Sequence, residues 1–561
     1  MKKILFFFPL MLLFFNISFG QRFIHADTLR GSNGPGRVWW DATKYDLHIK
    51  FNLEDSSITG YNVISFKELI KKHAPYFQID LQKPMVIDSV MLGGRSDSLN
   101  KKLNFTREGN AWFISLEAPP NLVKGDVAHS YYLPEKEPDL IVYFHGKPHQ
   151  AKNAPWDGGF VWRRDKELNP WISVACQGLG ASVWYPCKDY QGDEPDSAEM
   201  HFSSPPGLIT ISNGRLRSIK KGDEGNNVYT WAVESPINNY GITFYIGKYV
   251  HFDEIYKGEK GNLNMDYWVQ EYHIDKAKEQ FKDVPRMIKA FEYWFGPYPF
   301  YEDGYKLVDA PYLGMEHQSA IGYGNHYKNG YDGRDLSGSG WGMKWDFIII
   351  HESAHEWFGN SITAKDIADM WVQEGFANYA ETLYTEYYYG KKAATDYVVG
   401  IRKNILNDKP VIGHYGVNDE GSGDMYYKAG NMIHTIRQII NNDEKFRKIL
   451  RGMNEKFYHQ TVTGKQIEDY INQQSGINFS KVFDQYLKTT NIPELQYKKK
   501  GGKIYYRWAN CVDGFNMPVK IYNSKDELIF IHPTTKFQSL PYKLKEIRVD
   551  ENFYVNTKDV N

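Results

Sequence analysis

The sequence contains few cysteines and no excess of charge of either sign. Cys176, Cys187 and Cys511 are the only cysteines among 561 residues, which is too few for a disulfide framework, although Cys176 and Cys187 could pair across their short interval. Lys and Arg number 67 against 68 Asp and Glu, so the net charge of -1 gives no general attraction for nucleic acid or an anionic membrane. We therefore expect no nucleic-acid partner.

Long apolar runs are also missing, with one exception at residues 4–19, which follow Lys2 and Lys3 and precede the small residue Gly20. This order is typical of a secretory signal peptide. We predict a signal peptide over residues 1–20, cut after Gly20, and an exported protein, periplasmic or extracellular. An uncleaved anchor is the alternative, because the run is just short of the ~20 residues that span a bilayer. No later stretch is long enough, so we expect no stable membrane insertion after cleavage.

Length and patterning predict several domains. With 42% hydrophobic and 16% aromatic residues, the chain can bury several cores, roughly three or four at about 100–200 residues each. From residue 37 to about 246 the sequence is strand-like, with alternation at Tyr45, Leu47 and Ile49 and turn residues at 212–214. This pattern predicts a large all-β N-terminal domain.

Helical spacing replaces the alternation at about residue 275, where Val284, Ile288 and Phe291 share one face. Further helices are predicted at about 345–358, 370–389, 429–441 and 466–474. After Pro493 short β-like runs return, as at 503–508. We therefore predict a multi-domain α+β protein whose chemistry lies in the helix-rich domain.

The strongest chemical signal is the motif His351-Glu352-x-x-His355. On an α-helix, residues four apart project from one face, so the two imidazoles can bind one cation, with Glu352 beside them as a general base. A catalytic zinc usually takes three protein ligands and one water. Glu374, at the start of the next predicted helix after eighteen intervening residues, is the candidate third ligand. We therefore predict one Zn²⁺ per chain.

Two other interpretations of this motif are weaker. A zinc site with a third His six residues after the second is excluded, because Phe358 and Ser361 stand where Gly and His are required. A helix with two surface histidines is the other alternative. The apolar lead-in at 345–350 and the stop at Gly359 supply the helical context that a metal motif requires.

The residues around these ligands resemble the M1 family of zinc aminopeptidases, which includes aminopeptidase N and leukotriene A4 hydrolase. The resemblance covers nearly the whole chain after residue 20. It rests on the zinc motif with Glu374, on the segments 357–360 and 371–377, and on Gly314-Met315-Glu316-His317. It implies a saddle-like N-terminal β domain at 21–255, a thermolysin-like zinc catalytic domain at 256–490 and a small C-terminal β-sandwich at 491–561.

The family's exopeptidase motif, Gly-Ala-Met-Glu-Asn, is altered here at its first and last positions, where Leu313 and His317 stand. By resemblance, Glu316 receives the free α-amine of the substrate and Gln177 contributes to the same pocket. A carboxylate at a fixed distance from the metal selects a charged N-terminus. The neighbours Gly314, Met315 and His317 are then expected to place the peptide backbone, with His317 donating a hydrogen bond in place of the family's Asn.

Tyr426 occupies the first position of a segment that resembles the family's Tyr-x-Lys-Gly, with Lys428 in register and Ala429 in place of Gly. The resemblance implies that its hydroxyl stabilises the tetrahedral intermediate, and we prefer it to Tyr427. Long members of the family carry a large helical C-terminal domain, whereas only about seventy residues follow Asn491 here.

Two acidic residues near the motif are given lesser roles. Asp369, five residues before Glu374, could orient a zinc-bound imidazole from behind or cap a helix. Glu356 is expected to turn away from the metal face and is given no catalytic role.

The predicted function is hydrolysis of the N-terminal residue from peptides with a free N-terminus, with water activated by zinc and Glu352, and Tyr426 at the oxyanion. A thermolysin-type endopeptidase and a catalytically inactive zinc-bearing binding protein are the alternatives, and relatives that hydrolyse a lipid epoxide leave a minor extra activity open. Glu316 favours the aminopeptidase, because an endopeptidase gains nothing from a carboxylate that demands a free amine.

Overall fold

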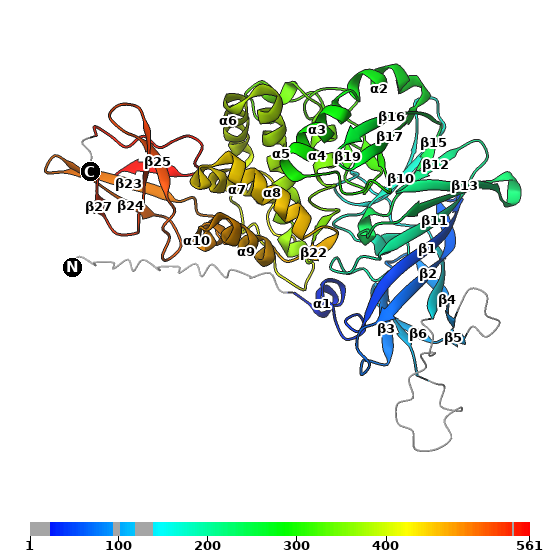
Figure 1. Cartoon of the computed structure of the whole chain (residues 1–561). Coiled ribbons are helices and arrows are strands. Elements are labelled where there is room, and N and C mark those ends of the chain that lie inside the picture. The colour runs from blue at the N-terminus through cyan, green and yellow to red at the C-terminus, as the bar shows by residue number, and fades with distance from the viewer. Residues whose placement is uncertain (1–22, 94–100, 118–137, 541–543) are drawn as a thin grey trace, which may run out of the picture.

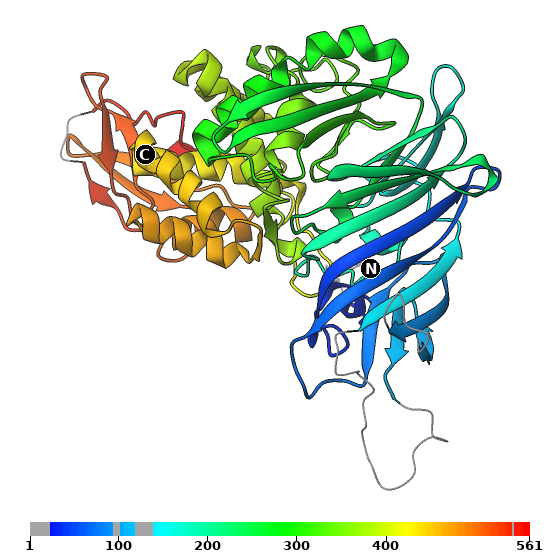
Figure 2. The same ribbon diagram turned by 45° about the vertical axis from the view of Figure 1, so that its right-hand side comes forward.

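The computed structural model describes residues 23–93, 101–117, 138–540 and 544–561. The signal peptide predicted at residues 1–20 lies outside these described residues and stays a prediction. Figures 1 and 2 show a β unit in blue and cyan, a helix-rich unit in green and yellow, and a smaller β unit in orange and red. The helix-rich unit lies between the two β units in both views. No helix of the described part is both long enough and apolar enough to cross a membrane.

An eight-stranded sheet forms the main wall of the first unit. Its strands are β1 (Trp40–Asn52), β2 (Ser57–Glu68), β4 (Val86–Gly93), β5 (Lys101–Leu103), β8 (Asp139–Gly146), β11 (Ser197–Ser204), β13 (Arg215–Lys221) and β14 (Asn227–Val233). Their order is β13-β14-β11-β1-β2-β8-β4-β5, with β1 and β11 parallel and the other neighbours antiparallel. Tyr45, Leu47 and Ile49 of β1 pack into the core, so by strand alternation Asp46 and His48 belong to the opposite face.

The short helix α1 (His25–Gly31) precedes the first strand of this unit, and two smaller sheets complete the unit. One has the order β3-β7-β6, from β3 (Tyr76–Asp80), β6 (Phe105–Glu108) and β7 (Ala111–Ser115). The other has the order β12-β15-β10-β9, from β9 (Gly159–Arg164), β10 (Pro170–Ala175), β12 (Ile209–Ser212) and β15 (Phe244–Gly247).

Cys176 and Cys187 do not form the bridge that their spacing allowed. Both are buried free thiols in the core of the N-terminal unit, and the Cys176 Sγ lies 3.8 Å from the carbonyl oxygen of Tyr240. Their interior position means that packing holds these segments without a covalent link.

The helix-rich unit opens with a five-stranded sheet in the order β16-β17-β18-β20-β19. Its strands are β16 (Tyr249–Gly258), β17 (Gly261–Gln270), β18 (Tyr305–Asp309), β19 (Gly314–Met315) and β20 (Ile321–Tyr323). The predicted boundary between residues 255 and 256 falls inside β16, which pairs with β17 along its whole length, so the sheet begins at Tyr249. The edge strand β19 carries the segment that resembles the exopeptidase motif.

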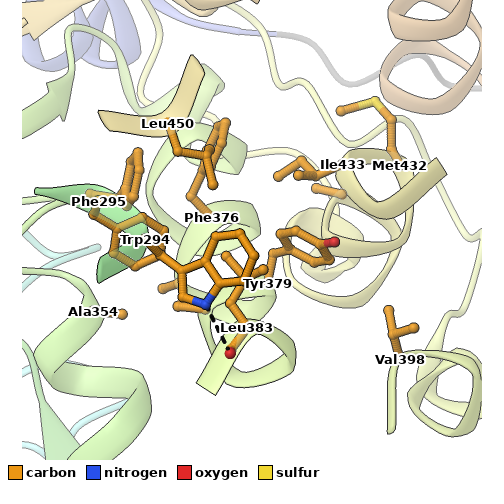
Figure 3. Packing of buried hydrophobic residues seen from close by; sticks show 14 of the residues in the cluster. Trp294, Phe295, Ala354, Phe376, Tyr379, Leu383, Val398, Met432, Ile433 and Leu450 are labelled. Carbon is orange, nitrogen blue, oxygen red and sulfur yellow. Dashed lines mark hydrogen bonds between the residues drawn. The ribbon is translucent and has the colours of Figure 1, made fainter. Parts of the chain in front are cut away.

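Helices pack around α5 to build the rest of this unit. They are α2 (Ile274–Gln280), α3 (Asp283–Phe295), α4 (Phe347–Ala354), α5 (Trp371–Tyr389), α6 (Lys391–Gly400), α7 (Tyr427–Ile440), α8 (Asp443–Lys456), α9 (Gly464–Ser475) and α10 (Ser480–Lys488). Figure 3 shows side chains of α5, such as Tyr379, packed among apolar residues of α3, α7 and α8, and the Trp294 Nε1 donating to the Leu383 carbonyl at 3.2 Å. This packing fixes α5 against its neighbours.

The predicted helices at 370–389, 429–441 and 466–474 correspond to α5, α7 and α9, whereas α6, α8 and α10 were not predicted. The predicted helix at 345–358 is shorter, because α4 starts after its cap Asp346 and ends at Ala354. In α8 the apolar residues Phe446, Ile449 and Met453 do follow helical spacing, and the high charge of that segment obscured it.

The C-terminal unit is a small β structure. Its strands are β23 (Glu494–Lys500), β24 (Lys503–Ala509), β25 (Val519–Tyr522), β26 (Leu528–Ile531), β27 (Gln538–Ser539) and β28 (Asn556–Asp559). They form a sheet in the order β27-β24-β23-β28 and a separate pair, β25-β26. Asn552 joins this unit to the helices by accepting from His434 Nε2 at 2.9 Å. The multi-domain α+β fold is confirmed.

Candidate metal centre

Helix α4 is capped at its N-terminus by Asp346 and is buried along its whole length. The Asp346 carboxylate accepts from the backbone N–H groups of Ile348 and Ile349 at 3.1 and 3.3 Å, which satisfies two of the orphan donors at a helix start. All eight residues of the helix are buried. His351 therefore lies on a fixed turn, and His355 follows as the helix ends.

The two imidazoles meet a carboxylate from α5. The Glu374 Oε2 lies 3.6 Å from His351 Nε2 and 3.3 Å from His355 Nε2, and all three side chains are buried. Ligands at about 2.1 Å from a tetrahedral zinc lie about 3.4 Å from one another. The sequence prediction thus named three residues that the fold brings together, and their spacing and donor types fit a zinc ion.

Both imidazoles are anchored at the opposite ring nitrogen. The His351 Nδ1 donates to Glu381 Oε1 at 2.8 Å, and the His355 Nδ1 donates to the Phe358 carbonyl at 3.0 Å. These bonds fix the tautomer that leaves Nε2 for a metal. Glu381 was not predicted, although it lies seven residues after Glu374 and so on the same face of α5.

The suggestion that Asp369 orients an imidazole is wrong. Its carboxylate accepts instead from the Tyr415 hydroxyl at 2.9 Å and from the Gly464 N–H at 2.8 Å, at the start of α9. It does not cap α5 either, because Met370 is the capping residue there. Asp369 thus ties α9 and the 415 region to the start of α5.

Charges in this cluster are strongly coupled. Burial lowers the pKa of both imidazoles, but hydrogen bonds to Glu374 and Glu381 hold the pKa of His351 well above its usual value. The Glu374 carboxylate likewise raises the pKa of His355 to about 9. Burial raises the pKa of Glu374, yet His355 and His351 hold it well below its usual range. The ionised Glu374 carboxylate thus faces two imidazoles whose raised pKa values favour the protonated form. A divalent cation suits this arrangement, because it replaces the imidazole protons when it binds.

Glu352 and Tyr426 flank the three ligands. A Cβ at Gly314 would lie 2.6 Å from Glu352 Oε1, so the absence of a side chain at that edge of β19 makes room for the Glu352 carboxylate. Burial raises the pKa of Glu352. The Tyr426 ring stacks near the His351 ring, with centroids 5.9 Å apart, just before α7 begins at Tyr427.

A third carboxylate, Glu316, lies beside the cluster. Glu316, Glu352 and His355 each offer one atom within 4.8 Å of the others. Gln177 donates to Glu316 Oε1 and, at 3.3 Å, to Glu374 Oε1, while the Tyr240 hydroxyl donates to Glu316 Oε1 at 3.3 Å. Burial is the main reason that the pKa of Glu316 is raised to about 7. Gln177 thus bridges Glu316 and a metal ligand.

His317 lies behind the site, contrary to the expected contact with the peptide backbone. Its side chain is buried, its Nδ1 donates to the Tyr245 hydroxyl at 2.8 Å, since that hydroxyl donates its own proton to the Ala320 carbonyl, and burial lowers its pKa to about 3. Gly314, Met315 and Glu316 line the cavity and His317 does not. Glu356 is also turned away, with its carboxylate accepting from the Tyr298 hydroxyl and the Ser319 N–H.

Two adjoining cavities meet at the metal ligands. The larger, about 730 Å³, is lined by the three ligands with Gln177, Glu316 and Tyr426, and by unpredicted residues such as Trp156 and Glu420. The second, about 420 Å³, shares Gly314, Glu352 and Tyr426, and extends to Arg334 and Phe347. One cavity thus reaches Glu316 and the other reaches Arg334.

These features define a class of site. Two imidazoles from one helix, a carboxylate from the next and a free glutamate between the imidazoles form the His₂Glu set of thermolysin-type catalytic zinc centres.

A scan against protein families agrees with this class. Residues 280–486 match the model described as Peptidase family M1 domain. This part of the chain, which holds His351, His355 and Glu374, is therefore a domain of peptidase family M1.

Curated relatives and solved structures point to the same family. The chain is 22% identical over 467 residues to probable aminopeptidase 2 of Sulfurisphaera tokodaii, covering 80% of this chain and 55% of that protein. It is 26% identical over 481 residues to aminopeptidase N of Lactococcus lactis subsp. lactis, covering 80% and 51%. The chain thus spans about half the length of these curated relatives. The M1 zinc metallopeptidase of Deinococcus radiodurans shares the fold, with a TM-score of 0.66 at 16% identity, covering 82% of this chain and 96% of that one.

Proposed function

We propose that this protein is a zinc-dependent aminopeptidase that removes the N-terminal residue from peptides. One observation carries the proposal: the Glu316 carboxylate lies within the same small cluster as Glu352 and the ligand His355. A carboxylate at that short, fixed distance from the reacting centre binds an α-ammonium group and so sets the cut one residue from the chain end. Curated relatives named aminopeptidase support the same activity.

His351, His355 and Glu374 would hold the zinc ion. When bound, zinc supplies Lewis-acid chemistry, polarising the scissile carbonyl and making a water nucleophilic at neutral pH. Glu352 accepts the proton of that water and passes it to the leaving amine, a role that suits a buried carboxylate whose pKa is raised.

Tyr426 stabilises the charge that develops on the carbonyl oxygen. Its ring lies 5.9 Å from the imidazole of His351, between centroids, and the residue lines both cavities, which supports a place for its hydroxyl beside the scissile bond. Burial raises the pKa of this hydroxyl well above its usual value, which keeps the proton on the oxygen for donation.

The two cavities suggest the course of the peptide. The residue to be removed occupies the larger cavity, with its amine at Glu316 and Gln177. The rest of the peptide leaves through the smaller cavity toward Arg334. A carboxylate such as Glu316 demands a free amine, which is why an exopeptidase is favoured over a thermolysin-type endopeptidase. The presence of Glu352 and Tyr426 beside an intact ligand set disfavours an inactive binding protein.

A matched pair of peptides tests the proposal. A hexapeptide with a free N-terminus and the same peptide with an acetylated N-terminus are incubated with zinc-loaded protein, and products are identified by mass spectrometry. We expect stepwise loss of single residues from the free peptide, no cleavage of the acetylated peptide and no activity after chelation. Internal cleavage of the acetylated peptide would indicate an endopeptidase, and an inert zinc-loaded protein would indicate a binding function.

A further inference from the structure

A second group of imidazoles and carboxylates lies far from α4 in the fold, on the eight-stranded sheet. It consists of Asp46 and His48 from β1 and His201 from β11, and we call it the sheet cluster. The parallel pairing of β1 with β11 places His48 directly opposite His201. Asp46 precedes His48 by two residues and so belongs to the same face of the sheet. Three potential metal ligands are thus brought together by strand register.

Their candidate ligand atoms lie close together. The Asp46 Oδ1 lies 2.8 Å from His48 Nε2 and 3.3 Å from His201 Nε2. All three atoms lie within 4.8 Å of one another, as they do in the cluster on α4 and α5. These separations are close to the roughly 3.4 Å between ligands of a tetrahedral zinc ion.

Neighbouring residues hold the rings in place. His48 and His201 stack with centroids 4.1 Å apart, and Tyr61 of β2 stacks on His48 at 4.2 Å. The Thr230 hydroxyl contacts His201 Nδ1 at 3.0 Å, so the Nε2 atom is the one that faces the carboxylate. Because the two ring planes are nearly parallel, at 9°, and a metal lies close to the plane of each imidazole that binds it, one of the two rings must turn out of the stack when a metal binds.

Solvent can reach the imidazoles but not the carboxylate. The side chains of His48 and His201 are 29% and 18% exposed, whereas that of Asp46 is 1% exposed. Glu199, also on β11, offers a further oxygen 3.2 Å from His201 Nε2, and Lys44 binds its other oxygen at 3.0 Å. A cation arriving from solvent would thus meet two imidazoles, one buried carboxylate and one partly exposed carboxylate.

We propose that Asp46, His48 and His201 form a second metal site, with Glu199 as a fourth donor, for a divalent transition metal such as Zn²⁺ or Co²⁺. Two nitrogen and two oxygen donors suit this group of metals and not Mg²⁺ or Ca²⁺, which prefer oxygen alone. Bound there, the metal cross-links the two parallel strands at the centre of the sheet. Since the cluster lies outside both cavities of the α4 centre, we expect its role to be structural.

Metal stoichiometry of the full chain tests this site. Protein stripped with a chelator is dialysed against micromolar Co²⁺ or Zn²⁺, and bound metal is counted by mass spectrometry. We expect two equivalents for the wild type, one for His48→Phe and one for His201→Phe. Phenylalanine retains the ring stacking while removing the nitrogen ligand, and circular dichroism verifies that each variant is folded.

Three further variants show which site binds each equivalent of metal. His251 is a matched control, because it pairs with Asp266 at 2.8 Å with similar exposure but without a second imidazole, so His251→Phe should still bind two. His351→Phe should bind one, and the double variant His351→Phe/His48→Phe none. A single equivalent in the wild type, or two in His48→Phe, overturns the proposal and leaves the sheet cluster as a proton-sharing network.

Discussion

The same side-chain types gather twice in this chain, with different surroundings. On α4 and α5 the imidazoles are buried, and carboxylates contact both ring nitrogens of His351, with Glu374 at one and Glu381 at the other. On β1 and β11 the imidazoles are partly exposed and share one carboxylate, Asp46, on a single side. Burial of the imidazoles and a charged anchoring group, Glu381 where the sheet cluster has Thr230, thus distinguish a site prepared for chemistry from one suited only to binding.

The largest difference between the two clusters is the free glutamate beside the buried ligands. Glu352→Gln should keep zinc in both clusters while turnover falls by about 100- to 10,000-fold, because general-base catalysis is lost. Turnover of an aminoacyl-nitroanilide and metal content are measured together. Glu356→Gln is the matched control one turn on, since Glu356 lies outside the cavities and should leave turnover near that of the wild type. Full activity in Glu352→Gln would contradict the assigned role.

Tyr426 is a second feature that the sheet cluster lacks. Tyr426→Phe should lower kcat by about 100- to 1,000-fold, because one oxyanion donor is removed, with little change in KM. Steady-state kinetics with a dipeptide substrate separate these parameters. A variant that raises KM alone would show instead that Tyr426 only helps to bind the peptide.

Anchoring at the far nitrogen can be weakened in each cluster. Glu381→Gln should reduce zinc affinity of the α4 centre by about 10- to 100-fold, because the bond to His351 Nδ1 loses its charge. Thr230→Val removes the neutral contact to His201 and should weaken the sheet cluster by less. Competition with a coloured chelator measures both affinities. Equal effects would mean that the charge of the anchoring group is unimportant.

The buried imidazole of His434, which is hydrogen-bonded to Tyr379 and Asn552, gives the smallest effect and a reference for both clusters. Burial lowers the pKa of His434 to about 3, between Tyr379 and Asn552. In the unfolded chain the imidazole of His434 is protonated as the pH falls below about 6.5, whereas in the folded chain it stays neutral down to much lower pH. The contribution of His434 to the free energy of unfolding is therefore fully present above pH 6.5 and is lost as the pH drops toward 3, by about 2 kcal/mol between pH 7 and pH 5. Urea unfolding of wild type and His434→Gln should show the smaller pH dependence in the variant, and identical slopes would contradict this origin.

Local spacing explains how much of the buried site could be predicted. His351, Glu352 and His355 follow from one helical turn, and Glu374 from the start of the next helix. Glu316 and Gln177 came only from the family resemblance, because their contact joins residues far apart in sequence. The direction of His317 depends on the turn after β19, which no sequence pattern specifies.

The sheet cluster could not be predicted for a related reason. His48 and His201 meet through parallel strand register, which is set by tertiary packing and has no local signature. The alternation of β1 was visible in the sequence, but not the identity of its partner strand. Glu381, in contrast, did carry a helical signal that was overlooked.

The most direct test of the account is a crystal structure of the zinc-loaded protein with anomalous data on both sides of the zinc absorption edge. We predict a strong peak about 2.1 Å from His351 Nε2, His355 Nε2 and a Glu374 oxygen. An absent peak there, or a zinc ion held without Glu374, would contradict the account.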